Sequence, residues 1–340
     1  MQYEKPWLSY EEQLMLLQER GLTITDKERA LAYLERIGYY RLSGYWYPFR
    51  QRTGICCLLR KEGRSKFKRG MTDKLVLDEF QPGAEFHQAV DLYVFDKKLR
   101  LLALDALERI EIGLRVDIAH TLGKQDKFAY LSPKRFSDKF AEDLNEKTGL
   151  TKHHHWIQKH AALINRSKEE FIKHHKNKYG LPVPIWIASE MWDFGTLSTL
   201  FSGMIPEEQN VIAKKYGIEK GAVFASWLRC LNYLRNVCAH HSRLWNRNMS
   251  EQPKRPDAGE AKNFELAWSH NHILARPFLM LCIAQHLLNT INPSSSWWQR
   301  LSEHLHTFPE LSHLGLDLNS IGIIEGWGNW KWGGTKSYRK

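Results

Sequence analysis

The segment Asn232–Trp245, which reads NYLRNVCAHHSRLW, carries side chains suited to phosphate chemistry. Arg235 stands five residues before His240, and Asn236 directly follows the arginine. A histidine can take up and return a proton near neutral pH. An arginine stabilises negative charge on a phosphate without losing its own proton, and an asparagine amide can orient a base or a phosphate oxygen. The grouping therefore predicts proton transfer at a phosphate ester.

RNA is the substrate that best suits this set of groups. Its 2′-hydroxyl lies beside the scissile phosphate and serves as the nucleophile, so the chemistry requires no metal ion and no cofactor. The motif predicts a metal-independent ribonuclease with Arg235, Asn236 and His240 as catalytic residues. One histidine cannot easily act as both base and acid on opposite sides of the phosphate. A two-fold dimer that brings two motif helices together would solve this, so we expect a homodimer.

The helical periodicity around the motif separates a buried face from a polar one. At about 100° per residue, the predicted buried residues are Trp227, Leu231, Leu234 and Cys238. Asn236 and His240 share a face roughly opposite this stripe, Arg235 lies at its edge, and His241 points back toward the core. A histidine in a helical pattern is more commonly a packed or capping residue. The arginine and asparagine that converge on His240 favour the catalytic interpretation.

A second pair with the same spacing, Arg115 and His120, has no asparagine beside it, which favours a structural interpretation. It lies in a predicted helix over Phe86–Gly123, for which we allow one break. The apolar stripe of this helix comprises Leu104, Leu107, Ile110, Leu114 and Ile118. Glu111 falls inside the stripe and needs a partner if it is buried. Arg115, four residues on, or an arginine from another helix would supply it.

The remaining pattern is also helical. Ser9 and Thr25 are predicted N-caps of two helices that end at Gly21 and Gly38. Further helices are predicted over Trp186–Leu200, over residues 206–217 and over Ala275–Leu288. Almost nothing alternates with period two, so the predicted fold class is all-α. The basic segment 51–70 is predicted to be a loop or a short hairpin.

The charge of the chain points to a polyanionic partner. Its 340 residues carry a net charge of +11, with a pI near 9.3, which favours nucleic acid or an anionic surface over a merely basic protein. The aromatic segment 39–50 is either a core corner, which we favour, or a stacking surface for bases. The predicted RNA-binding residues are Arg41, Arg60, Lys61, Arg64, Lys66, Lys68 and Arg69.

Other functional classes are disfavoured. The five cysteines form no CxxC pair, which fits a reducing cytosol better than a disulfide scaffold. The N-terminal residues lack the pattern of a signal peptide, and no apolar run is long enough to span a bilayer. We therefore expect a cytoplasmic protein with no membrane role. A metal enzyme built on the histidine-rich segments 153–155 and 174–175 is disfavoured because no HExxH or CxxC companion is present.

Several stretches together resemble the Abi-like abortive-infection family of the HEPN superfamily. They are KPWLSYEEQLMLLQERGL, ERIGYYRLSGYWYPFR, FDKKLRLLALDALERIEIGLR, PIWIASEMWDFGTLSTLF and LRNVCAHHSRLWNR. The resemblance implies a HEPN-type helical bundle over residues 83–292. An N-terminal helical and basic-loop extension (1–82) and a C-terminal basic, Trp/Gly-rich tail (293–340) would flank it.

The resemblance also implies roles for individual residues. Arg235 and His240 take the two positions of a motif that cuts RNA without metal, commonly across a dimer, and Asn236 matches its polar residue. The expected supporting residues are Glu108, Glu111, His241 and Arg243, with Glu108 or Glu111 holding Arg235 in place. The implied function is an RNA-cleaving toxin of phage defence, restrained by or bound to a small noncoding RNA. The alternative is a noncoding-RNA-binding protein with little or no nuclease activity.

Overall fold

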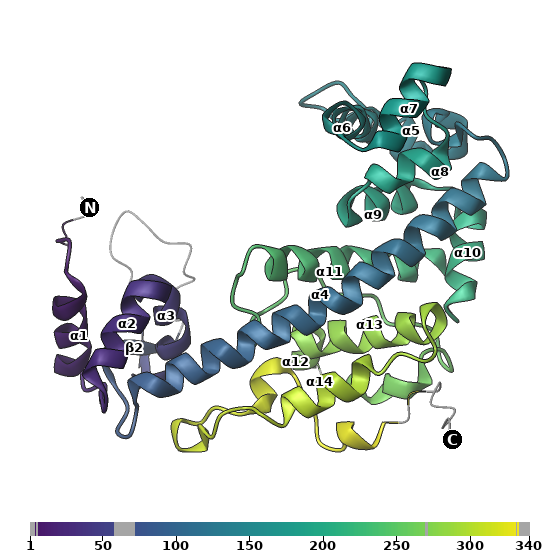
Figure 1. Cartoon of the computed structure of the whole chain (residues 1–340). Coiled ribbons are helices and arrows are strands. Elements are labelled where there is room, and N and C mark those ends of the chain that lie inside the picture. Colours follow the sequence, from purple (N-terminus) through teal and green to yellow (C-terminus); the bar gives the residue numbers. More distant parts are fainter. Residues whose placement is uncertain (1–3, 5, 58–71, 269–270, 331, 333–340) are drawn as a thin grey trace, which may run out of the picture. The chain divides into compact units, whose positions relative to one another are not determined.

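The computed structural model describes residues 4, 6–57, 72–268, 271–330 and 332 (Figure 1). Within these residues it has fourteen α-helices and one two-stranded sheet. The fold is therefore mostly helical, and the expected all-α class is corrected by this small sheet. The chain forms two compact units. Unit 1 comprises Met1–Lys98 and His304–Asn319, and unit 2 comprises Leu99–Glu303 and Ser320–Lys340. The HEPN type of the bundle and the division at residues 82 and 292 stay predictions.

Three helices open unit 1: α1 (Tyr10–Glu19), α2 (Lys27–Ile37) and α3 (Tyr39–Trp46). Ser9 caps α1 in a capping box, in which Glu12 N–H donates to the serine hydroxyl and Ser9 N–H donates to the Glu12 carboxylate. The predicted cap Thr25 is wrong, because Asp26 caps α2 and accepts from Arg29 N–H at 2.9 Å. Asp26 directly precedes the first helical residue, where a carboxylate reaches the open N–H groups.

The aromatic segment after α2 divides between core and surface. Tyr45, Trp46 and Phe49 are buried, and the Tyr45 hydroxyl donates to Asp96 at 2.7 Å. Tyr40 and Tyr47 are exposed. The favoured core interpretation is therefore confirmed for these three buried residues, whereas Tyr40 and Tyr47 face solvent and Tyr39 is half-buried.

The hairpin follows α3 after a 3₁₀ turn over Tyr47–Phe49. Strands β1 (Arg50–Cys57) and β2 (Thr72–Phe80) pair antiparallel, with Arg50 opposite Phe80 and two shifts of register near Arg52. Such bulges interrupt the alternation of side chains, so the strands leave no clear period-two signal. The predicted RNA-binding residues of the basic segment lie outside the described residues, namely Arg60, Lys61, Arg64, Lys66, Lys68 and Arg69. The exposed Arg41 lies on α3.

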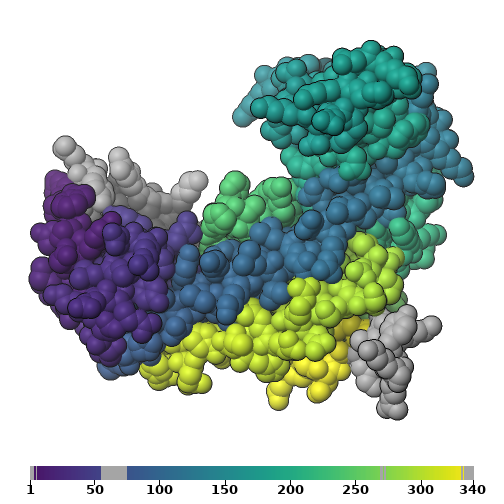
Figure 2. Space-filling model, in the orientation of Figure 1, coloured from purple at the N-terminus to yellow at the C-terminus, as the bar shows by residue number. Residues whose placement is uncertain are grey.

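Helix α4 (Phe86–Gly123) has the predicted bounds and no break. Its residues up to Lys98 belong to unit 1 and those from Leu99 to unit 2. The predicted stripe is buried at Leu107, Ile110, Leu114 and Ile118, and Leu104 is half-buried. Another face of α4 carries the exposed Leu101, Ile112 and Val116. Along unit 2 a blue band of α4 accordingly stays at the surface in Figure 2.

Unit 2 is built around α11 (Gly221–Ala239). It packs against α9 (Phe194–Gly203), α10 (Pro206–Lys215) and α13 (Pro277–Ile291). The predicted buried face of α11 is confirmed, since Trp227, Leu231, Leu234 and Cys238 are all buried. The other helices are α5 (Asp138–Ala141), α6 (Lys152–Arg166), α7 (Glu170–Tyr179), α8 (Ile185–Ala188), α12 (Asn271–Leu274) and α14 (Trp297–Leu305). No helix of the described chain combines the length and apolar character needed to cross a bilayer.

The predicted helix over Trp186–Leu200 is wrong, because the chain breaks between α8 and α9. Helix α8 ends at Ala188, a 3₁₀ turn spans Ser189–Met191, and Trp192 is extended. Asp193 then caps α9 by accepting from the N–H and the hydroxyl of Thr196, at 2.7 and 2.8 Å. The break gives α9 its own N-terminus, which Asp193 caps.

The C-terminal tryptophans pack onto unit 2. Trp332 lies 4.6 Å from Trp298 of α14 between ring centroids, and Trp327 lies 5.8 Å from Phe278 of α13. Trp327 and Trp332 are both buried. The described part of the tail therefore contributes aromatic surface to the core of unit 2.

Candidate functional site

The motif helix ends earlier than the helical pattern predicts. Helix α11 stops at Ala239, and His240 is its C-cap, with its N–H donating to the Asn236 carbonyl at 3.0 Å. His241 adopts a left-handed conformation, with φ of 56°, and Ser242 N–H returns to the Val237 carbonyl. The prediction that His241 points toward the core is wrong, because this turn leaves it exposed. Both imidazoles therefore lie at the surface of unit 2.

Arg235 and Asn236 meet on the last turns of α11. An Nη1 hydrogen of Arg235 is donated to Asn236 Oδ1 at 3.4 Å, and both side chains are half-buried. His240 is exposed, and its side chain has no hydrogen bond or ion pair among the described residues. The arginine is thus partly held in place while the imidazole stays accessible for proton transfer.

Glu111 of α4 faces this arginine from the neighbouring helix. Burial raises the pKa of the Glu111 carboxyl, against the opposing charges of Arg115 and Arg235. The carboxylate accepts from Arg115 Nη2 at 3.2 Å and from the backbone N–H of Phe194. Glu108, by contrast, is exposed and forms no hydrogen bond or ion pair with any described residue. The structure thus brings Glu111, and not Glu108, within electrostatic reach of Arg235.

The N-terminus of α9 lies next to Glu111 and to helix α11. Asp193 accepts from Lys159 Nζ at 2.9 Å. Burial raises the pKa of Asp193, but hydrogen bonds from Lys159 and Thr196 lower it more, so this carboxyl stays ionised. A Cβ on Gly195 would lie 3.3 Å from the Asn232 side-chain oxygen, so α9 and α11 approach closely here. Sequence reasoning missed these residues, although Asp-Phe-Gly-Thr carries the spacing of an N-cap.

Arg115 acts as a structural ion-pairing residue. It pairs with Glu111 at 3.2 Å and with Glu190 at 3.3 Å, and it donates to the Trp192 carbonyl at 3.1 Å. His120, five residues on, is exposed. This geometry agrees with the structural interpretation of Arg115 in the second Arg–His pair.

Further basic side chains follow the end of α11. Arg247 donates through Nε to the Tyr233 hydroxyl at 3.1 Å and through Nη1 to the Arg243 carbonyl at 3.3 Å. Burial raises the pKa of Tyr233, but Arg247 and Ser250 lower it further, so the net shift is downward. Arg243 itself is half-buried. The segment that follows His240 in the sequence therefore carries two further arginines.

The histidines of segment 153–155 make hydrogen bonds within the chain. His153 is buried, and its Nε2 lies 2.8 Å from the Tyr130 carbonyl. His154 and His155 make hydrogen bonds to the hydroxyls of Thr151 and Thr148. Across the described ranges, no three His, Cys, Asp or Glu residues are grouped so that they could hold a metal ion.

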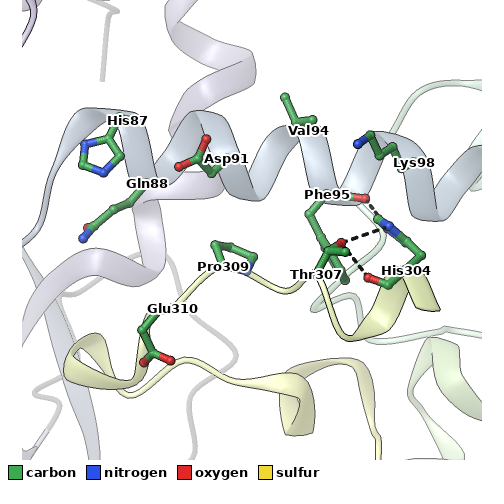
Figure 3. A pocket seen from close by; sticks show the side chains of 10 residues that line it. All are labelled: His87, Gln88, Asp91, Val94, Phe95, Lys98, His304, Thr307, Pro309 and Glu310. Carbon is green, nitrogen blue, oxygen red and sulfur yellow. Dashed lines mark hydrogen bonds between the residues drawn. The ribbon is translucent and has the colours of Figure 1, made fainter. Parts of the chain in front are cut away.

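Unit 1 contains an open pocket of about 480 Å³ between α4 and the segment after α14 (Figure 3). Both ring nitrogens of His304 are engaged there, Nε2 with the Phe95 carbonyl at 2.9 Å and Nδ1 with the Thr307 hydroxyl at 3.3 Å. The lining places Lys98 together with two carboxylates, those of Asp91 and Glu310. This pocket therefore lacks the net positive charge that a phosphate ligand would require.

One comparison with known proteins gives a match. Residues 32–246 fit the model of a family described as Abi-like protein. The matched range covers Arg235, Asn236 and His240, as well as Glu111 and the start of α9. No match to the chain is found among curated proteins or among solved structures.

Proposed function

The chain belongs to the Abi-like protein family, and on that premise we propose that it is a metal-independent endoribonuclease that acts as an RNA-cleaving toxin. Membership of the family implies a role in abortive infection, which is a defence against phage. Arg235, Asn236 and His240 are the proposed catalytic residues. The observation that carries this proposal is the arrangement at the end of α11. Arg235 is held beside Asn236 and the Glu111 carboxylate, while His240 is accessible at the helix terminus.

The proposed reaction is a transesterification within the RNA strand. His240 removes the proton from a 2′-hydroxyl, and the 2′-oxygen attacks the adjacent phosphorus. Arg235 stabilises the extra negative charge on the phosphate, and Asn236 orients Arg235 or a phosphate oxygen. The bond from phosphorus to the 5′-oxygen breaks, and that oxygen receives a proton from a general acid. The products are a 2′,3′-cyclic phosphate and a 5′-hydroxyl.

A homodimer supplies the general acid in this proposal. Each protomer contributes one exposed motif histidine at the end of α11. Two motifs related by a two-fold axis would place a base and an acid on opposite sides of one phosphate. Glu111 is a positioning residue, because it acts on the substrate only through Arg235.

The alternative function is the binding of a noncoding RNA with little or no cleavage. It draws on the net charge of +11, which favours any RNA through phosphate contacts and is spread more widely than the motif. In the toxin proposal, the same kind of small RNA would restrain the nuclease.

The test compares wild type with His240→Ala, and His174→Ala serves as a matched control because His174 is an exposed histidine of α7. Each purified protein is incubated with labelled total RNA in EDTA, and the fragment ends are analysed. We expect wild type and His174→Ala to leave cyclic or 3′-phosphate ends, and His240→Ala to lose about a hundredfold or more of the rate. If wild type and His240→Ala both bind RNA and neither cuts it, the result would support the noncoding-RNA-binding function instead.

A further inference from the structure

Unit 2 has a second open pocket, of about 530 Å³, at the C-terminal end of α4. It lies between α4 and α8 with the 3₁₀ turn that follows α8. The residues that define it are Arg115, Val116, His120, Lys124, Trp186 and Glu190. Both members of the second Arg–His pair thus line one cavity, which the proposed catalytic roles leave unused.

The apolar part of the lining includes the Trp186 indole and the Val116 side chain. Trp186 is 53% exposed and Val116 is 58% exposed, although both are large apolar side chains. A Cβ on Gly123 would lie 3.1 Å from Ile185 Cγ2 and 3.5 Å from Trp186 Cε3. Glycine at this position therefore lets α8 and the Trp186 indole lie close against α4. The packing of α8 against α4 therefore fixes the backbone at Trp186, while much of the indole is exposed to solvent.

The rim of the pocket is basic. His120 on α4 and Lys124, the residue directly after its end, are exposed and line the pocket together with Val116. The acidic group of the lining, Glu190, is already paired with Arg115 at 3.3 Å. The unpaired charge available to a ligand is therefore positive.

An occupant should be both aromatic and anionic. A nucleotide meets both requirements, because bases stack on aromatic side chains and the phosphate pairs with cations. A second copy of this chain is a poorer fit, since it also carries a net charge of +11 and would be repelled by the basic rim.

We propose that this pocket binds one unpaired nucleotide of the RNA, with the base stacked on Trp186 and the phosphate against His120 and Lys124. The proposal rests on the RNA-directed function proposed above and names the form of RNA that the site accepts. A base inside a duplex is not free to stack on a side chain, so the bound strand must be single-stranded here. Arg115 links the pocket to the motif, because the same guanidinium that lines it binds Glu111.

The test measures affinity separately from cleavage. A labelled single-stranded oligoribonucleotide with 2′-O-methyl groups cannot be cut through its 2′-oxygen, so its binding to the full chain is read by fluorescence anisotropy. We expect Trp186→Ala to weaken binding about tenfold and Trp186→Phe to weaken it much less. Trp7→Ala is the matched control, because Trp7 is 85% exposed and lies in unit 1. Lys124→Ala should lower both the affinity and the salt dependence.

Abasic RNA tests the stacking itself. An oligomer that lacks bases should bind wild type about tenfold more weakly, and Trp186→Ala should add no further loss. Equal affinity of wild type and Trp186→Ala for intact RNA, with equal thermal unfolding, overturns the pocket. So does a Trp186→Ala variant that changes only the sedimentation of the protein, because the pocket would then serve a protein partner.

The two proposals fail in different ways. If cleavage requires His240 but Trp186→Ala changes neither its rate nor its KM, only the proposal of nucleotide binding in the pocket is contradicted. Binding that depends on Trp186, with no cleavage by wild type, overturns the nuclease alone. A wild-type chain that binds neither intact nor modified RNA overturns both.

Discussion

The Arg115 guanidinium lies 3.2 Å from the Glu111 carboxylate, one helical turn away on α4. An isolated pair of this kind contributes little on a helix surface. Here both side chains are largely buried, and the carboxylate also accepts from the N–H of Phe194 and interacts with the charge of Arg235. Glu111 therefore joins three helices, α4, α9 and α11, at the proposed catalytic arginine.

Replacement of Glu111 by glutamine should impair cleavage more than folding. Glutamine keeps the shape and an acceptor oxygen but removes the charge that faces Arg235. We expect the cleavage rate to fall about tenfold, while the free energy of unfolding changes by less than about 1 kcal/mol. Single-turnover cleavage and urea unfolding of the same preparations measure the two effects.

Glu108→Gln is the control for this prediction, because Glu108 lies three residues earlier on α4 and is exposed. It should leave both rate and stability unchanged. Glu111→Ala should cost about 1–2 kcal/mol, because it leaves Arg115 with Glu190 as its remaining carboxylate. A rate loss for Glu108→Gln as large as that for Glu111→Gln would contradict the positioning role.

His160 should make the protein sensitive to acid. Burial lowers the pKa of this imidazole to about 4 from its ordinary 6.5. Its Nδ1 accepts from Trp192 Nε1 at 3.0 Å, next to the start of α9. Between pH 6.5 and 4 the unfolded chain binds a proton that the folded chain excludes, so stability is lost as the pH falls. We expect His160 alone to remove about 2 kcal/mol between pH 7 and pH 5.

The effect of His160 is isolated by comparison with His160→Gln, since other buried histidines titrate in the same direction. The difference in unfolding free energy between wild type and this variant should shrink by that amount over the same pH interval. His174→Gln, an exposed control, should follow the wild-type pH profile. Parallel profiles for wild type and His160→Gln would show that this imidazole is not protected from protonation.

Removal of the α9 cap should destabilise unit 2. Asp193→Ala eliminates the acceptor for Thr196 and the ion pair with Lys159, and we expect a loss of about 1–2 kcal/mol. Asp193→Asn keeps an acceptor oxygen for the helix and should lose less. Chemical unfolding of the three proteins checks this order, and equal stabilities would mean that the cap contributes nothing measurable.

The proposed dimeric site can be tested with dimers that combine wild-type and variant protomers. Wild-type and His240→Ala chains with different tags are co-expressed, and the mixed species is purified. If one phosphate needs both motif histidines, the mixed dimer should lose nearly all of the wild-type activity, because it carries only one intact motif. Retention of about half would indicate that each protomer cuts RNA alone.

Much of the helical fold was predictable because its signals are local. The bounds of α4 follow from a long apolar stripe, and the capping box of α1 is visible in its sequence. The break before Asp193 was missed because apolar residues continue through it and no proline marks it. The end of α11 was missed for a similar reason, since a histidine takes the left-handed position that glycine commonly fills.

The candidate site was predictable only in part. Arg235, Asn236 and His240 are neighbours in sequence, so their spacing alone marks them. Glu111 and Asp193 come from distant segments, and their approach to α11 depends on packing that no single segment specifies. The resemblance to a family pointed to Glu108 and Glu111 equally, and burial in the structure separates them.

The three cysteines of unit 2 have a practical consequence. Cys230, Cys238 and Cys282 are buried and form no disulfide, and burial raises the pKa of the Cys230 thiol to about 12. A thiol that stays protonated and out of solvent reacts slowly with alkylating reagents. Their rate of modification therefore reports how often α11 and α13 open in the native protein. These cysteines are built-in probes of whether RNA, once bound, holds the motif helix closed.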